Sequence, residues 1–482
     1  MGASIKGLNL IFEHCTGQGA DLPNGIDLSD ERLLTLLARH KWSWHGNFLH
    51  EYREKFGHDV PVFCNYIPIS EDFYYQRMLY EFTTPHRNLN KDDVYFFPIG
   101  AFGNLDTCLG MNENRISSIK LLSDKSIELI NHNDNVFLLI NHMEEGYFTK
   151  ENIMKIISEC KNKKIKSGKV VFGTACYNVK DVLEKYCNEI NTTYEIKSIY
   201  YNWALESCAK HWKMILNRPN DYKFYQDIQH YESITTEDKV LELKDKIRDN
   251  KFISFNNKLR SHRMLFLSIL NNNNQLNNNL ISYDISDLDK QHSYDSCESK
   301  MKDFLFTDEE REYYLTSHKL EIEKQTVDID NIRDARGHGW DRDSSYLNSY
   351  INLTTETLFF EDCWYISEKI FKPIANLQPF VVIGSPFILK ELQKLGFKTF
   401  NEYWSEEYDS ETSHVDRMRK INQVIVELSN KPISEIHDMY YKMLPDLVYN
   451  QNLLLSYEDT KTNQLELVKN LKGFMPTGTQ LL

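Results

Sequence analysis

The most informative hydrophobic pattern in the chain lies between residues 350 and 409. A β-rich run, Tyr350–Phe360, mixes threonines with apolar residues, and a segment opening at Ser367 has helical spacing. The short apolar run Phe380–Ile383 is typical of a buried parallel strand, and Pro386–Leu395 again has helical spacing. This order predicts a βαβ array, in which ligands bind at the carboxyl ends of the strands.

Strand-like and helical runs also alternate in the amino-terminal half. Such alternation indicates an α/β domain with a largely parallel sheet. The expected strands are Leu8–Phe12, Val94–Ile99, Val136–Ile140, Val170–Gly173 and Tyr194–Tyr200, and the expected helices are Asp30–Arg39, Glu151–Lys163 and Val179–Ile190. Polar and aromatic sequence follows from His211 to Tyr231. We therefore expect two α/β domains, at residues 1–225 and 226–430, and a helical extension over 431–482 that packs back on the first domain.

The second domain is predicted to contain two basic or polar strand-to-helix turns. One follows the strand Lys251–Phe255 and precedes the apolar helix Met264–Leu270. This turn contains Lys258, Arg260 and Arg263, and Arg offers a bidentate fork to a diphosphate where Lys offers a point charge. A polar helix, Asp238–Asp249, is expected before it, and an amphipathic helix, Val415–Leu428, is expected later.

The other turn is formed by Ser367, Glu368 and Lys369. Ser367 is a plausible helix N-cap, and the N–H groups and dipole of a helix start favour an anion. Lys369 adds a point charge for a phosphate, and Glu368 can accept hydrogen bonds from a ribose diol. Glu356 is the one carboxylate in the preceding strand-like run.

The residues Thr355-Glu356-Thr357, followed by SEKIFKPIANLQPFVVIG, resemble the donor-binding half of fucosyltransferase-like, inverting GT-B glycosyltransferases. The basic turn resembles the N-x-x-x-R-x-x-R element of the same enzymes. The resemblance covers about a third of the chain, from Phe252 to about Leu428. It implies a GT-B-like fold, with two Rossmann-like domains facing a cleft, and a metal-independent transfer from a nucleoside-diphosphate sugar to a hydroxyl.

The resemblance also implies roles for individual residues. Arg260 and Lys369 would bind the diphosphate with support from Arg263, Glu368 would bind the ribose, and Glu356 would contact sugar or ribose. Together with Asn257 and Ser367, these residues form the expected donor site. No organic cofactor or metal is expected; the donor would be a GDP- or UDP-linked sugar.

The catalytic base is expected at the end of the strand Val136–Ile140 in the first domain. His142, Glu144 and Glu145 follow that strand, and a carboxylate or His can deprotonate an acceptor hydroxyl. Glu144 is the first choice and Glu206 a lower-ranked alternative. Asp341 and Asp343 imitate a metal-binding D-x-D motif, but they lie in a polar loop, so a mobile loop near the donor is the preferred interpretation.

Composition narrows the setting without identifying the acceptor. Nine cysteines indicate free thiols in a reducing compartment, and the absence of a long apolar run or an apolar leader favours a soluble, cytoplasmic protein without membrane insertion. A net charge of −14 disfavours broad nucleic-acid binding. A carbohydrate or another hydroxyl acceptor is expected. Two alternatives stay open: a catalytically inactive nucleotide-sugar-binding scaffold, and a glycosyltransferase that acts on modified DNA bases.

Overall fold

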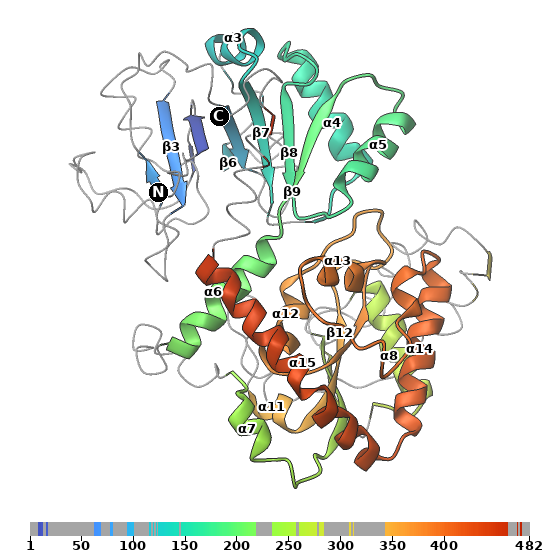
Figure 1. Ribbon diagram of the computed structural model, residues 1–482. Helices are drawn as coiled ribbons and strands as arrows, with labels where there is room; N and C mark the ends of the chain where they lie inside the picture. The colour runs from blue at the N-terminus through green and yellow to red at the C-terminus, as the bar shows by residue number, and fades with distance from the viewer. Residues whose placement is uncertain are drawn as a thin grey trace. The chain divides into compact units, whose positions relative to one another are not determined.

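The structure is a computed structural model of the chain (Figure 1). It describes residues 8–12, 16–17, 62–68, 78–80, 94–100, 115–116, 119, 122, 124–143, 146–217, 234–256, 260–276, 279–283, 308–309, 312, 343–460, 470 and 473–474. The chain forms two compact units. Residues 1–203 and 459–482 make up the first unit, and residues 204–458 make up the second.

The first unit is built on a seven-stranded mixed sheet. Its strand order is β4 (Met78–Tyr80), β3 (Val62–Pro68), β1 (Leu8–Phe12), β5 (Tyr95–Gly100), β7 (Val136–His142), β8 (Val170–Thr174) and β9 (Ile196–Tyr200). Strands β1, β5, β7, β8 and β9 pair in parallel, whereas β3 is antiparallel to both of its neighbours. A short antiparallel pair, β2 (Thr16–Gly17) with β6 (Arg115–Ile116), lies outside this sheet.

Helices α3 (Asp124–His132), α4 (Lys150–Asn162) and α5 (Val179–Glu189) belong to the same unit, and Figure 1 shows α4 and α5 beside β8 and β9. Helix α4 begins with a capping box: Thr149 Oγ1 accepts from Asn152 N, and Asn152 Oδ1 accepts from Thr149 N. Its buried residues recur at helical spacing, and strand β8 is buried along its whole length.

The second unit contains a wholly parallel four-stranded sheet. The order is β11 (Leu280–Tyr283), β10 (Asn250–Asn256), β12 (Ser349–Thr355) and β13 (Phe380–Ile383). Strands β12 and β13 are buried throughout, as expected for a parallel sheet covered on both faces. The helices are α6 (Trp203–Asn217), α7 (Glu237–Leu241), α8 (Ser261–Asn272), α11 (Asp343–Leu347), α12 (Glu368–Ala375), α13 (Ile388–Lys394), α14 (His414–Asn430) and α15 (Ile433–Thr460), with a 3-10 turn, η4 (Glu407–Ser410).

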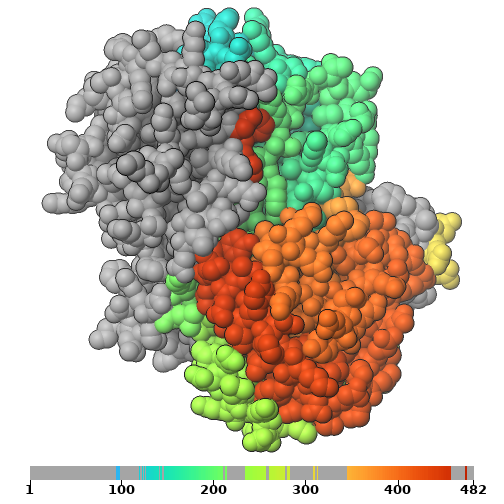
Figure 2. Space-filling view, viewed as in Figure 1, coloured from blue at the N-terminus to red at the C-terminus, as the bar shows by residue number. Residues whose placement is uncertain are grey.

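The long helix α15 packs on the second unit. Tyr440 Oη donates to Leu377 O at 2.8 Å, and Gln451 Nε2 donates to the carbonyls of Thr235 and Ala375. Residues 343–460, orange to red in Figure 2, form most of the visible surface of this unit. Beyond α15, the ring of Phe474 lies 6.1 Å from that of Phe137 in the first unit.

The expectation of two α/β units with largely parallel sheets is confirmed. Strands β3, β4 and β11 were not predicted, and other differences occur at element ends. The polar helix expected over Asp238–Asp249 stops at Leu241. Only Val240 of α7 is buried, and the residues that follow form turns. The apolar side chain of Ile247 is 47% exposed, so burial would stabilise a longer helix little. Strand β12 ends at Thr355, so Glu356 begins the next loop. The helix expected over Asp30–Arg39 and the boundary near residue 225 lie outside the described residues.

Two further observations bear on the chain's setting. Among the described residues, no helix is both long and apolar enough to cross a membrane. The five cysteines that the structure describes, Cys160, Cys176, Cys187, Cys208 and Cys363, are all free thiols.

Candidate nucleotide-binding site

The candidate site lies where two neighbouring parallel strands of the second unit end. Strand β10 leads toward helix α8, and β12 leads through a loop into helix α12. Arg260 is the N-cap residue of α8, and Ser367 is the N-cap residue of α12. Both helices start at this edge of the sheet, which is where open α/β sheets bind ligands.

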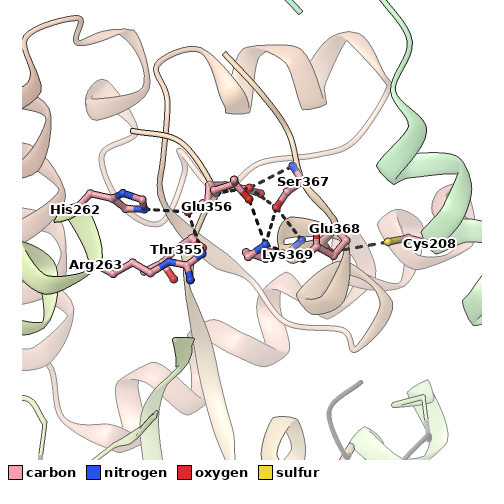
Figure 3. Close-up of polar contacts among 9 residues, drawn as sticks. Cys208, His262, Arg263, Thr355, Glu356, Ser367, Glu368 and Lys369 are labelled. Atoms are coloured by element: carbon pink, nitrogen blue, oxygen red, sulfur yellow. Dashed lines mark hydrogen bonds and ion pairs between the residues drawn. The ribbon is translucent and has the colours of Figure 1, made fainter. Parts of the chain in front are cut away.

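Glu356 and Ser367 join the end of β12 to the start of α12. Ser367 Oγ donates to Glu356 Oε2 at 2.5 Å, and the N–H groups of Ser367 and Thr357 donate to the same oxygen at 3.2 Å. Ser367 Oγ in turn accepts from Lys369 N at 3.3 Å, which is a helix N-cap bond. Figure 3 shows these side chains turned toward one another. The predicted cap is therefore present.

The Glu356 carboxyl group is fully buried. Burial raises its pKa, although the Lys369 ammonium and the Ser367 hydroxyl act in the opposite direction. The second oxygen, Oε1, is also buried and makes no hydrogen bond within the described part of the chain. Glu356 thus holds the start of α12 in place and presents no surface to solvent.

Glu368 and Lys369 are the accessible charges of this turn. Lys369 Nζ lies 2.6 Å from Glu368 Oε1, and their side chains are 27% and 31% exposed, respectively. The ammonium also donates to Thr357 Oγ1 at 3.3 Å and to Ser367 Oγ at 3.4 Å. Burial acts to raise the pKa of Glu368, but Lys369, together with Lys372, outweighs it and holds that pKa at about 2. The Glu368 carboxylate is therefore ionised at neutral pH.

Arg263 and His262 tie the start of α8 to the end of β12. Arg263 Nη2 donates to the carbonyls of Thr355 and Glu356 at 3.1 and 3.2 Å, and His262 Nε2 donates to the Glu356 carbonyl at 2.9 Å (Figure 3). Both side chains are buried. Burial lowers the pKa of Arg263 to about 10, and burial with the adjacent Arg263 holds the pKa of His262 well below its ordinary value. His262 is therefore neutral, and Arg263 remains a cation at neutral pH.

Arg260 differs from Arg263 because it is exposed. Its charge nevertheless acts on this edge of the sheet, since it lowers the pKa values of both His262 and Arg263. Of the two arginines in this turn, Arg260 is thus available to a ligand, whereas Arg263 donates its hydrogen bonds to backbone carbonyls.

Arg417 on α14 is a part of the site that the sequence analysis missed. It is 1% exposed; Nη2 donates to Phe359 O at 2.5 Å and Nε donates to Gly384 O at 3.1 Å. It therefore fastens the loop after β12 to the end of β13. A signal existed: Arg417 stands four residues before Ile421, on the face of α14 that the apolar residues occupy.

Several predicted residues lie elsewhere or cannot be placed. Asn257, Lys258, Glu144, Glu145 and Asp341 are outside the described residues, and Asp343 opens helix α11. In the first unit, β7 runs two residues past its expected end, so His142 is its last residue; the side chain is buried, and its Nε2 donates to Tyr147 O at 3.0 Å. Glu206 is a buried residue of α6. Within the described part of the chain, no cluster of three or more His, Cys, Asp or Glu could hold a metal ion.

Comparisons with known proteins add little to this geometry. No protein-family model matches the chain, and no curated protein matches it. Similar solved structures include an alpha,alpha-trehalose-phosphate synthase (UDP-forming) from Burkholderia vietnamiensis, at 10% identity and a TM-score of 0.33, covering 79% of this chain and 74% of that chain. Another is the N-terminal domain of Candida albicans trehalose-6-phosphate phosphatase, at 10% identity and a TM-score of 0.36, covering 79% and 70%. We draw no conclusion from likenesses at these TM-scores.

Proposed function

We propose that the chain is an inverting, metal-independent glycosyltransferase of GT-B-like, fucosyltransferase-like organisation. It would move a sugar from a GDP- or UDP-linked donor to a hydroxyl acceptor, with a glycan as the favoured acceptor. The observation that carries the proposal is the convergence of two strand-to-helix turns at one edge of a parallel sheet, with accessible Arg260, Glu368 and Lys369. The free thiols of the described cysteines fit a reducing compartment such as the cytoplasm.

The donor would bind through charges and helix starts at this edge. Lys369, aided by the dipole of α12, would bind one phosphate, and Arg260 would bind the other through two N–H groups. The ionised Glu368 would accept hydrogen bonds from the ribose diol. Arg263 and Glu356 are buried, so the proposal assigns them to holding the two turns together.

The reaction would form one bond and break one at the anomeric carbon. The acceptor oxygen attacks that carbon from the side opposite the diphosphate, the bond to the diphosphate oxygen breaks, and the acceptor proton passes to a base. Arg260 and Lys369 would stabilise the charge that develops on the leaving diphosphate, as a metal ion does in other enzymes. Glu144 is the proposed base, with Glu145 second, and His142 and Glu206 as further candidates.

A transfer assay tests the proposal. The full chain is incubated with UDP- and GDP-linked sugars and a panel of glycan acceptors, with and without excess chelator. We expect release of the nucleoside diphosphate that depends on acceptor and survives chelation. The transfer rates of Glu144→Gln, Glu145→Gln and Glu206→Gln are compared with that of the wild type at equal donor saturation. One of the replacements should reduce the rate by roughly 10²–10⁴-fold.

The assay also separates the alternatives. Activity that is lost with chelator and restored by manganese or magnesium would contradict the metal-independent mechanism. Donor binding without transfer to any glycan, but with transfer to modified DNA, would identify nucleic acid as the acceptor. Donor binding without any transfer would favour a nucleotide-sugar-binding scaffold.

A further inference from the structure

Phe387 has an unusual backbone conformation for an aromatic residue. It is the N-cap residue of α13, with φ 64° and ψ 17°, in the left-handed region. Glycine adopts this region freely, whereas a residue with a bulky side chain does so at an energetic cost. Such strain persists where the surrounding structure imposes it, and it often occurs at ligand sites. The presence of an aromatic ring at this strained position therefore requires an explanation.

Asp409 on η4 imposes this conformation. Phe387 N donates to Asp409 O at 2.6 Å, and the Asp409 carboxylate accepts from Leu389 N at 2.8 Å and from Lys390 N at 3.1 Å. The side chain at position 387 makes no cap hydrogen bond, so the aspartate caps α13 from a distant part of the chain. Hydrogen bonds to Asp409 therefore hold the backbone of Phe387 and of the residues after it in place without a ligand.

The fixed backbone brings the Phe387 ring against Trp364. The two ring centroids are 5.0 Å apart, with the planes inclined at 46°, and Lys390 Nζ lies 5.5 Å from the centre of the Phe387 ring. Trp364 and Phe387 are both partly exposed, and Lys390 is exposed. Trp364 lies on the loop after β12 and Phe387 on the loop after β13, the neighbouring parallel strand. The two aromatic residues thus lie on loops that start at the same edge of the sheet as the candidate site, with the Lys390 ammonium beside them.

We propose that Trp364 and Phe387 form a stacking surface for the base of the nucleoside diphosphate. The inference rests on the proposed function, because it assumes that a diphosphate binds at Arg260 and Lys369. Trp364 stands three residues before Ser367, in the loop that delivers the phosphate-binding helix start. A planar base can stack on an aromatic ring whatever its identity. Lys390 carries only donors, so it would favour bases with carbonyl oxygens at their edge, which uracil and guanine both have.

The test compares ligands with and without a base on the full chain. Titration calorimetry measures binding of UDP, GDP and inorganic diphosphate to the wild type and to Trp364→Ala, Phe387→Gly and Phe387→Asn. Glycine and asparagine both tolerate the left-handed backbone, so these variants should fold. We expect each variant to bind UDP or GDP about tenfold more weakly, and inorganic diphosphate within about twofold of the wild type.

A second aromatic–lysine pair supplies the matched control. Tyr449 on α15 is 44% exposed, and Lys398 Nζ lies 4.9 Å from its ring centre, but neither residue belongs to the strand-end loops. Tyr449→Ala should bind all three ligands as the wild type does.

The possible results separate this inference from the function on which it rests. If the wild type binds UDP or GDP and the Phe387 and Trp364 variants bind them equally well, the stacking surface is rejected and the proposed function stands. Equal weakening of nucleotide and inorganic diphosphate binding would also reject it. A wild type that binds neither nucleotide contradicts the proposed function itself.

Discussion

At the scale of single residues, the candidate site divides its charges into exposed and buried ones. Lys369 and Glu368 are part-exposed and paired at 2.6 Å, whereas Arg263 and Glu356 are buried and bonded to the ends of neighbouring elements. An exposed ion pair contributes little to stability, but a buried charge whose partners are removed costs much more. Binding and stability should therefore respond to different residues.

The two arginines of the basic turn test this division. Arg260→Ala should weaken binding of a nucleoside diphosphate and leave stability almost unchanged, because Arg260 is exposed. Arg263→Ala should lower the free energy of unfolding by about 1–3 kcal/mol, because the carbonyls of Thr355 and Glu356 lose a buried donor. Calorimetry and urea denaturation measure the two effects. The reverse assignment, with Arg263 affecting affinity alone, would contradict the division.

The pH dependence of stability should carry a small contribution from Glu368, whose ion pair with Lys369 is part-exposed. Its folded-state pKa of about 2 lies below the ordinary value of 4.5. A lowered carboxyl pKa stabilises the folded state above the ordinary value, and this contribution is lost as the pH falls toward the folded-state value. Between about pH 5 and pH 3, the wild type should therefore lose more stability than Glu368→Gln. Urea midpoints measured across this range give the comparison, and parallel curves for the two proteins would contradict it.

At the scale of elements, the site depends on close packing between the end of β12, the end of β13 and the start of helix α13. A Cβ atom at Gly384 would lie 2.7 Å from Ile388 Cδ1 and 2.9 Å from Glu356 Cβ. Such distances require the neighbouring side chains to shift. The absence of a side chain at Gly384 therefore allows Glu356 to reach the start of α12.

Gly384→Ala should consequently disturb both stability and binding. We expect a loss of about 1–3 kcal/mol in the free energy of unfolding, the usual cost of overpacking, and a weaker affinity for the nucleoside diphosphate because Ser367 is displaced with Glu356. Denaturant titration and calorimetry on the same preparation measure both quantities. A variant with wild-type stability and affinity would show that the contact at Gly384 has no bearing on the site.

The hydrophobic pattern predicted the elements around the site better than their ends. Strand β13 matches the apolar run Phe380–Ile383, and Ser367 caps α12 as expected. Tertiary contacts decided the rest. The buried state of Glu356 depends on Ser367, eleven residues later, and the strain at Phe387 depends on Asp409. No local propensity contains such contacts.

At the scale of the whole molecule, the chain comprises two α/β units whose sequences are unequally informative. The second unit carries the motifs that led to the proposed donor site, and its parallel sheet has those motifs at one edge. In the first unit the parallel strands were predicted to within two residues, with β7 running on to His142, whereas β3 and β4 were not predicted. The residues proposed there as the base, Glu144 and Glu145, lie outside the described part, so that assignment stays a prediction.

The central claim is that the start of α12 binds the phosphates of a nucleotide, and calorimetry on one lysine variant tests it most directly. UDP and GDP are titrated into the wild type, Lys369→Ala and Lys398→Ala. Lys398 also pairs with a carboxylate, at 2.5 Å from Asp446, but on a different part of the second unit. The account predicts that the wild type and Lys398→Ala bind one nucleotide alike, and that Lys369→Ala binds it at least tenfold more weakly. Equal affinity in all three proteins, or no binding by the wild type, would contradict it.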